Sequence, residues 1–273
     1  MFPFSVCMSV YRNDNPEDLC TALNSVIIQS VPPSEVILIV DGPVSHELEK
    51  IIRKYEADYS FVHPVWLAEN GGLGNALKIA VEKASCEYIA RMDSDDISMP
   101  DRFKKQLECF EREPDLSIVG GRITEFVDSE DNIVGSRCCP LKDSEIKRYM
   151  KSRCGLNHVT VMFRRSEVLK AGNYLDWFWN EDYYLWIRMW KQGCKFCNLE
   201  DVLVNVRVGY DMYARRGGWT YFKSEAKLQK YMWKQHLIGF PRFMFNVAVR
   251  WGVQVMLPNR MRGFVFQKLF REK

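Results

Sequence analysis

The chain has 273 residues, of which 47% are hydrophobic and 27% are charged. This composition excludes an intrinsically disordered chain and is typical of one folded core with a short appendage. The net charge of +3 is unevenly distributed, because residues 220–273 hold 11 of the 38 basic residues but only 2 of the 35 acidic ones. We therefore expect one folded domain at 1–219 and a basic, amphipathic helical region at 220–273.

The cysteines and the apolar segments indicate the cellular compartment of the protein. The nine cysteines form no paired framework, and no signal-peptide pattern precedes the first apolar run, so a reducing, cytoplasmic setting is expected. The most apolar late stretch, 243–257, is interrupted by Asn246 and Arg250 and is too short to span a bilayer. No sequence motif supports nucleic-acid binding.

The first hundred residues alternate between apolar strands and amphipathic helices. Strands are expected at 4–10, 35–40, 61–67 and 87–92, and helices at 17–29, 45–57 and 72–84. This alternation predicts a parallel, doubly wound α/β sheet. In such sheets ligands bind beyond the carboxyl ends of the strands, which is where Asp41 and Asp93 stand.

The second half mixes both kinds of element. Helices are expected at 102–112, 143–152, 181–192 and from about 221 onward, and extended segments at 117–127, 133–137 and 159–163. The whole pattern predicts a mixed, mostly parallel sheet flanked by helices, with a helical tail.

Three carboxylates follow the expected strand 87–92 within four residues. Asp93, Asp95 and Asp96 repel one another there, which favours a bound cation. Hard oxygen ligands of this kind suit Mn²⁺ or Mg²⁺. The alternative is a solvated acidic turn that caps the next helix. A position at the end of a sheet strand favours the metal site.

A glycine-rich segment at 70–74 precedes the expected helix 72–84. Its glycines allow a close approach of the backbone to a ligand at a helix start. A dinucleotide-binding fingerprint would follow the first strand and end in a further glycine, so NAD binding is excluded.

Six segments occur in the order of a known family. They are MSVYRNDNPEDLCTALNSVIIQS, VILIVDGP, ENGGLGNAL, EYIARMDSDDISMPDRF, NHVTVMF and NEDYYLWIRM. Together they resemble the family-2 inverting glycosyltransferases, which have the Rossmann-like GT-A fold, over residues 4 to about 215. The subgroup they resemble includes bacterial O-antigen and capsule transferases that extend an undecaprenyl-diphosphate-linked sugar.

The resemblance implies a UDP-sugar donor site at the strand ends. It assigns the donor to Val10, Tyr11, Asn13, Asp41, Asn70, Gly71, Asn75, Arg91, Asp93 and Ser94. A carboxylate at position 41 is able to accept the uracil N3 proton, although capping of helix 45–57 explains it equally well. Arg91 has the alternative role of a structural ion-pair partner. The resemblance places the metal on Asp95, with Asp93 beside it.

Glu181 and Asp182 begin the expected helix 181–192. Acidic residues in a first helical turn are favoured by the helix dipole whatever the function. The resemblance instead implies that Asp182 is the general base that deprotonates the acceptor hydroxyl, and that Glu181 holds an acceptor hydroxyl. A single displacement of this kind inverts the anomeric carbon.

Four further residues are assigned to the acceptor. They are His158, Trp179, Arg207 and Arg215. Guanidinium groups match diphosphate oxygens, and an indole ring stacks on a sugar. The alternatives are a structural histidine, a packed tryptophan and a solvated basic loop.

The tail combines lysines with aromatic and aliphatic residues. Segments 221–237 and 243–257 have amphipathic patterns suited to an anionic leaflet. The alternatives are packing on the catalytic domain or a dimer interface. The expected location is therefore cytoplasmic and peripheral, on the inner face of the cell membrane.

The resemblance predicts a metal-dependent, inverting hexosyltransferase. It would move galactose or glucose from a UDP-sugar to a lipid-diphosphate-linked GlcNAc or GalNAc, with a β-1,3 linkage as the best prediction, in O-antigen or capsule biosynthesis. One alternative is a sugar nucleotidyltransferase, although residues 8–16 lack its glycine-rich loop. The other is a non-catalytic nucleotide-sugar-binding module. The presence of both Asp95 and Asp182 argues against it.

Overall fold

The computed structural model describes residues 2–209 and 217–258. The strands are β1 (Phe4–Val10), β2 (Glu35–Val40), β3 (Val62–Trp66), β4 (Tyr88–Arg91), β5 (Ile97–Ser98), β6 (Leu116–Phe126), β7 (Ile133–Arg137), β8 (Met162–Arg164) and β9 (Lys195–Arg207). The helices are α1 (Pro16–Ile27), α2 (His46–Asp58), α3 (Leu73–Lys83), α4 (Arg102–Arg112), α5 (Asp143–Met150), α6 (Arg165–Lys170), α7 (Glu181–Lys191), α8 (Trp219–Lys234) and α9 (Phe240–Trp251).

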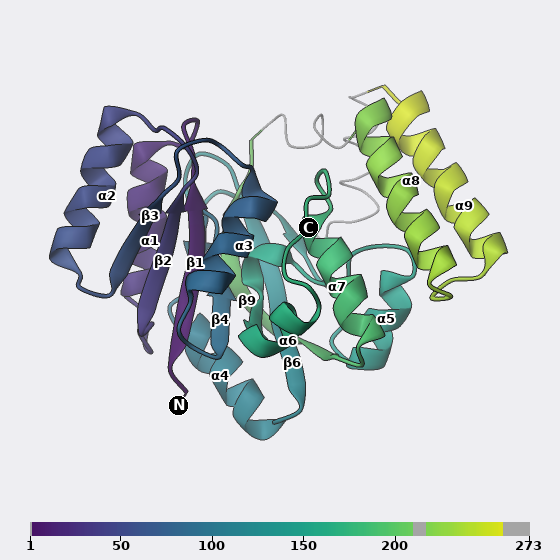
Figure 1. The fold of residues 1–273 in the computed structure, drawn as a ribbon, viewed down its shortest axis with the longest axis horizontal. Helices are drawn as coiled ribbons and strands as arrows, with labels where there is room; N and C mark the ends of the chain where they lie inside the picture. Colours follow the sequence, from purple (N-terminus) through teal and green to yellow (C-terminus); the bar gives the residue numbers. More distant parts are fainter. Residues whose placement is uncertain (1, 210–216, 259–273) are drawn as a thin grey trace.

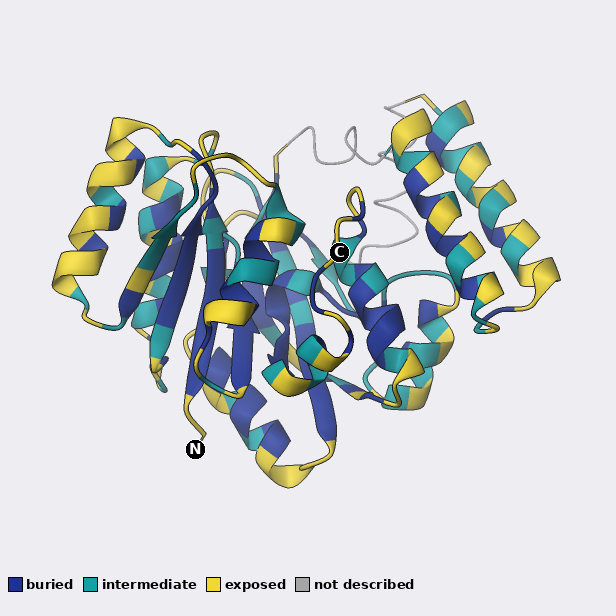
Figure 2. Ribbon diagram, viewed as in Figure 1, coloured by how far each residue is buried: buried dark blue, intermediate teal, exposed yellow. Residues whose placement is uncertain are grey.

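The strands form one mixed sheet between two layers of helices (Figure 1). Its order is β3-β2-β1-β4-β8-β6-β9-β5, with β7 paired to the far part of β6. The first four strands of this order are parallel, whereas β8 runs antiparallel to both β4 and β6. The central strands are buried, as Figure 2 shows. The predicted mixed, mostly parallel α/β fold is confirmed.

The parallel strands β1, β2 and β4 bury both of their faces, which explains their largely apolar sequences, whereas the edge strand β3 is only partly buried. In β2, Val36, Leu38 and Val40 pack in the cluster that also contains α1, α2 and α4. The alternate residues Ile37 and Ile39 pack in the cluster that also contains α3 and α7. The period of two along the strand therefore divides the core into two layers.

The pairing register brings the carboxyl ends of three strands to one edge. Val10 of β1 pairs with Val40 of β2, and Cys7 of β1 pairs with Arg91 of β4. The residues that follow these strands therefore lie close together, and they include Asp41 and Asp93.

The expected strand 159–163 is corrected by the structure. A 3-10 turn, η1, occupies His158–Thr160, and the strand β8 begins only at Met162. The Thr160 hydroxyl donates to the Asn157 carbonyl at 2.8 Å, and the Asn157 side chain donates to the Gly121 carbonyl at 2.8 Å. These local hydrogen bonds from side chain to backbone compete with strand pairing.

The helices α8 and α9 form an antiparallel pair at one end of the molecule, which we call the C-terminal hairpin (Figure 1). Leu228 and Met232 of α8 pack in the same apolar cluster as α7. A short π-helical turn, Gly252–Met256, follows α9. Within residues 2–209 and 217–258, none of the helices has the length and hydropathy needed to span a bilayer.

Candidate active site

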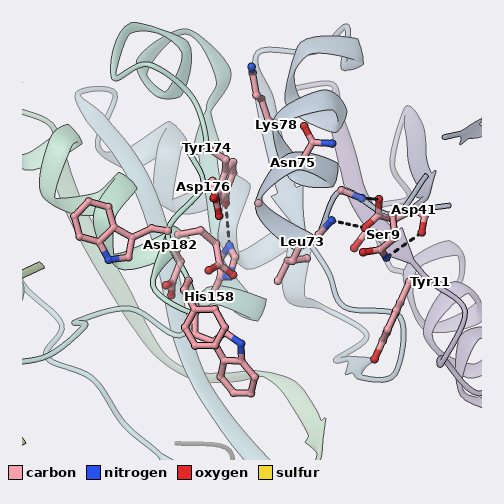
Figure 3. Close-up of a pocket in the computed structure, with 18 of the residues that line it drawn as sticks. Ser9, Tyr11, Asp41, Leu73, Asn75, Lys78, His158, Tyr174, Asp176 and Asp182 are labelled. Atoms are coloured by element: carbon pink, nitrogen blue, oxygen red, sulfur yellow. Dashed lines mark hydrogen bonds between the residues drawn. The ribbon is translucent and has the colours of Figure 1, made fainter. Parts of the chain in front are cut away.

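A cavity of about 920 Å³ opens at the carboxyl edge of the parallel strands. Its size suits a small-molecule ligand. The residues in Figure 3 fall on two sides. One side, which we call the donor wall after the role that the sequence predicts for its residues, carries Tyr11 and Asp41, and the Ser94–Asp14 hydrogen bond joins the segment 93–95 to it. The other side, which we call the acceptor wall for the same reason, carries His158, residues 174–179 and the start of α7.

On the donor wall, Asp41 organises the glycine-rich segment. Its two carboxylate oxygens accept hydrogen bonds from the backbone N–H groups of Gly71 and Gly72, at 2.7 and 2.9 Å. The neighbouring Gly42 has a φ of +83°, and a Cβ there would lie 2.6 Å from the Asn70 backbone nitrogen. Only glycine therefore permits this approach. Each Asp41 oxygen keeps a second lone pair for a ligand.

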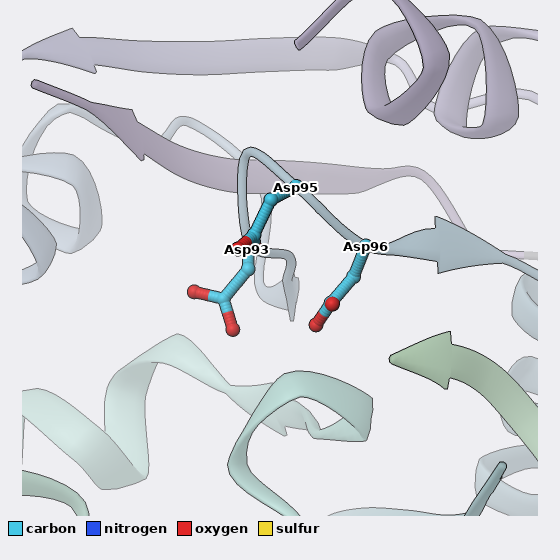
Figure 4. A group of neighbouring side chains, drawn as sticks. All are labelled: Asp93, Asp95 and Asp96. Carbon is cyan, nitrogen blue, oxygen red and sulfur yellow. The ribbon is translucent and has the colours of Figure 1, made fainter. Parts of the chain in front are cut away.

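The acidic turn, residues Asp93–Asp96, brings the side chains of Asp93, Asp95 and Asp96 close together (Figure 4). Oxygen atoms of Asp93, Asp95 and Asp96 lie within 4.8 Å of one another. The Arg91 guanidinium is buried and pairs with the Asp93 carboxylate through two nitrogens. The Arg207 backbone N–H donates to Asp96 at 2.8 Å. Asp95 is the exposed member of the three.

Two carboxylates of the acidic turn, those of Asp95 and Asp96, have raised pKa values. Desolvation, followed by repulsion from Asp93 and Asp14, raises the pKa of Asp95 to about 7. Burial, followed by repulsion from Asp93 and Asp95, raises the pKa of Asp96 well above its usual value. A divalent cation would relieve this repulsion, so the donor set fits one.

On the acceptor wall, a second pair of carboxylates faces the cavity. Glu181 and Asp182 form the first turn of α7, where the helix dipole favours negative charge. Burial, followed by repulsion from Asp182, raises the pKa of Glu181 to about 7. Burial also raises the pKa of Asp182, against the opposing effects of the Tyr183 backbone N–H and the Arg91 and Arg137 charges.

His158 is held neutral beside this pair. Its Nε2 atom lies 2.9 Å from the Tyr174 hydroxyl, as the dashed line in Figure 3 shows. Burial, followed by the charge of Arg91, lowers the pKa of His158 well below its usual value. The imidazole is therefore a neutral hydrogen-bonding group at this wall.

Most of the residues predicted from sequence line this single cavity. Those that line it are Tyr11, Asp41, Asn70, Gly71, Asn75, Asp93, Ser94, Asp95, His158, Trp179, Glu181 and Asp182.

Four predicted residues are not part of the lining. The Val10 side chain is buried in the core, and Asn13 is exposed. Arg91 lies behind Asp93, in the ion pair that was its alternative role. Arg207 pairs with Asp18 at 3.0 Å and donates to the Asp95 carbonyl at 3.2 Å. Arg215 lies outside the described residues.

Sequence reasoning missed several lining residues. They are Ser9, Asp14, Lys78, Tyr174 and Asp176, among others. Asp14 accepts a hydrogen bond from the Ser94 hydroxyl at 2.7 Å and so connects the end of β1 to the acidic turn. Lys78 follows Asn75 by one helical turn of α3, and this spacing was a usable signal.

The fold and the cavity define a class of protein. A Rossmann-like sheet with an acidic turn at its carboxyl edge, facing a second carboxylate pair, is the arrangement of a GT-A-type glycosyltransferase. The chain belongs to glycosyl transferase family 2, whose family model matches residues 5–172.

Individual relatives agree with this assignment. The chain is 35% identical over 265 residues to the amylovoran biosynthesis glycosyltransferase AmsE of Erwinia amylovora, covering 97% of this chain and 98% of the relative. It is 33% identical over 268 residues to the UDP-Gal:alpha-D-GlcNAc-diphosphoundecaprenol beta-1,3-galactosyltransferase of Escherichia coli, covering 98% and 96%. Its fold resembles that of the mannosyltransferase PcManGT from Pyrobaculum calidifontis, solved with GDP-Man and Mn²⁺, with a TM-score of 0.63 at 15% identity over 96% of this chain and 72% of that chain.

Proposed function

We propose that this glycosyltransferase is an inverting hexosyltransferase that transfers galactose or glucose from a UDP-sugar to a lipid-diphosphate-linked GlcNAc or GalNAc. The product would carry a β-linkage, β-1,3 by preference, in O-antigen or capsule polysaccharide. The observation that carries the proposal is the single cavity with the acidic turn on one wall and Asp182 on the other. The 33% identity to the E. coli galactosyltransferase over nearly its full length supports the choice of donor and acceptor.

The donor wall suits a UDP-sugar. Tyr11 and Asp41 would hold the nucleoside, because a tyrosine ring stacks on a base and a carboxylate accepts the uracil N3 proton. The diphosphate would lie at the start of α3, where the helix dipole and Lys78 favour negative charge.

The acidic turn would hold Mn²⁺ or Mg²⁺. Asp95 is its principal ligand in this proposal, because Asp93 and Asp96 already accept hydrogen bonds from Arg91 and from the Arg207 backbone. The ion would offset the charge that develops on the departing diphosphate. The Mn²⁺ in the PcManGT structure supports this choice of metal.

Asp182 would act as general base. Its carboxylate faces the cavity, and its raised pKa brings it nearer to the operating pH of a base than an ordinary aspartate. Deprotonation of the acceptor hydroxyl lets that oxygen attack the anomeric carbon as the bond to the diphosphate breaks. Glu181, His158 and Trp179 would orient the acceptor sugar.

The C-terminal hairpin would meet the membrane that carries the acceptor lipid. In α8, Lys223, Lys227, Lys230 and Lys234 are exposed at helical spacing. In α9, most of the exposed side chains are instead apolar, with Phe245 63% and Met244 50% exposed. A lysine row beside an apolar face suits an anionic leaflet, and it supports a cytoplasmic, peripheral location.

Vesicle flotation tests the membrane proposal. The protein should float with phosphatidylglycerol vesicles and not with phosphatidylcholine vesicles, and Phe245→Glu should weaken this by about 10-fold. Ile133→Glu, which charges an exposed apolar residue on β7, is the matched control. Equal flotation with both lipids would contradict the proposal that the C-terminal hairpin binds an anionic membrane. Unchanged flotation of the Phe245→Glu variant would contradict it as well.

Transfer to a synthetic acceptor tests the activity. UDP release from a panel of UDP-sugars should require a GlcNAc- or GalNAc-diphosphate lipid and should be fastest with UDP-galactose or UDP-glucose. Release that is fastest with a different sugar nucleotide would reject the donor. A purified protein without turnover on any of these pairs would reject the function.

A further inference from the structure

The segment that leads into α7 makes an unusual turn at the acceptor wall. We call residues 177–180 the 177–180 turn. Trp179 within it has a φ of +59°, a left-handed conformation that is uncommon for a non-glycine residue, and its side chain is 45% exposed at the cavity. A strained conformation persists only where the surroundings hold it.

Ser224 of α8 holds this turn through three hydrogen bonds. Its hydroxyl donates to the Phe178 carbonyl at 2.5 Å and accepts from the Asn180 side chain at 3.2 Å. Its backbone carbonyl accepts from the Trp177 indole at 3.3 Å. The three partners surround Trp179 in the sequence. One buried serine therefore fixes the backbone on both sides of the strained residue.

The turn is directly continuous with the carboxylate pair. Asn180 is the N-cap residue of α7, and its side-chain amide donates a hydrogen bond to Ser224 instead of capping the helix. Glu181 and Asp182 follow immediately. A displacement of the 177–180 turn would therefore move the first turn of α7 and the Asp182 carboxylate with it.

The hairpin itself is anchored independently of this turn. Glu225 of α8 pairs with Arg250 of α9 at 2.5 Å, and both side chains are largely buried. Arg250 also donates to the Ser152 carbonyl at 2.6 Å, and Asn246 donates to the Lys151 carbonyl at 2.8 Å. These contacts hold α9 against the segment that follows α5, and the Glu225–Arg250 ion pair ties α8 to α9. Ser224 therefore lies on a helix whose position does not depend on the 177–180 turn.

We propose that Ser224 is a positioning residue for the reaction: it sets the 177–180 turn and thereby the placement of Asp182 and Trp179 against the acceptor. The C-terminal hairpin then supports the active site, in addition to forming the proposed membrane-binding surface. This inference rests on the proposed role of Asp182 as base. Misplacement of a reacting group by about 1 Å is enough to lower a rate by up to about 100-fold.

Ser224→Ala tests the inference. It should lower kcat for transfer by about 10-fold and leave the affinity for UDP in the presence of Mn²⁺ within about twofold, because UDP would lie on the donor wall. Ser5→Ala is the matched control, since Ser5 is a buried serine whose hydroxyl also makes two hydrogen bonds, to Glu35 and from the Cys86 backbone. The control should retain kcat.

A second variant guards against a folding defect in Ser224→Ala. Asn180→Ala removes only the hydrogen bond to the serine hydroxyl, and it should lower kcat less than Ser224→Ala does. The double variant should resemble Ser224→Ala, because the two changes act on one contact. Additive losses, an unchanged kcat, or a loss of UDP affinity equal to the loss of kcat would overturn the positioning role.

The outcome is separable from that of the proposed function. If Asp182→Asn retains transfer, the base assignment fails whatever Ser224 does. If Asp182→Asn abolishes transfer while Ser224→Ala and Asn180→Ala retain the full kcat, the positioning role alone fails.

Discussion

The donor wall comes from consecutive strand ends, whereas the acceptor wall depends on α8, whose Ser224 lies 44 residues beyond its partner Asn180. On the donor wall, pairing of β1 with β2 and β4 brings Asp41 and the acidic turn to the same edge of the sheet. On the acceptor wall, a strained turn is held by a remote helix. The geometry of the donor wall therefore follows from strand pairing in the sheet. The geometry of the acceptor wall depends on the packing of α8 against the 177–180 turn.

The largest expected effect separates the two walls. Asp182→Asn keeps the shape of the side chain and removes the base, so kcat should fall about 1,000-fold while UDP affinity stays unchanged. Steady-state transfer and calorimetric UDP titration check both values. Asp143→Asn, at an acidic first-turn residue of α5 outside the cavity lining, should retain activity. Full transfer activity in Asp182→Asn would show that Asp182 is not the general base.

The next effect concerns the metal site that we propose at the donor wall. Asp95→Ala should abolish the dependence of UDP affinity on Mn²⁺ and lower transfer about 100-fold, because the exposed carboxylate is the proposed ligand. UDP titrations with and without Mn²⁺ measure this. Asp101→Ala removes an exposed aspartate that makes no capping hydrogen bond, and it should behave as wild type. A variant at position 95 that keeps its metal response would disprove the assignment.

A smaller effect is expected at the glycine-rich segment. Asp41→Asn leaves one of the Gly71 and Gly72 N–H groups without its acceptor, so UDP affinity should fall about 10-fold. Glu35→Gln changes a carboxylate at the other end of β2, where Ser5 and Ser85 donate to it. This control should lower stability and spare UDP affinity. Equal losses of affinity in both variants would show that Asp41 acts only through the stability of β2.

The smallest effect is a change in the pH dependence of stability. The pKa of Glu181 is raised to about 7 from its ordinary value of 4.5, so the folded state binds its proton more tightly than the unfolded state. The free energy of unfolding of the wild type should therefore fall as pH rises from about 4.5 to 7. Glu181→Gln should flatten this dependence in denaturant titrations at pH 5 to 8. Parallel curves for the two proteins would contradict the raised pKa.

The difference between the walls also decides what the sequence could predict. The strands at 4–10 and 35–40 match β1 and β2, because continuous apolar runs indicate strands buried on both faces. The acidic turn was found for the same reason, since it follows such a strand directly. The local sequence pattern was sufficient to predict those elements whose structure depends mainly on neighbouring residues.

The remaining elements depend on long-range contacts. The strand β9 was not predicted, because only some of its residues are buried and its middle, Glu200 and Asp201, is exposed. Ser224 carried no signal either, since a serine on a helix shows its role only when Phe178 and Asn180 are in contact with it. The functional assignment of the acceptor wall came from the family resemblance, and its geometry came from the structure.

The stereochemistry of the product tests the central claim most directly. In our proposal a single base faces a metal-binding turn across one cavity, which implies one displacement and therefore inversion at the anomeric carbon. With an α-linked UDP-hexose and a lipid-diphosphate acceptor, NMR of the anomeric proton in the product should show a β-linkage. An α-linked product would contradict the arrangement of the two walls.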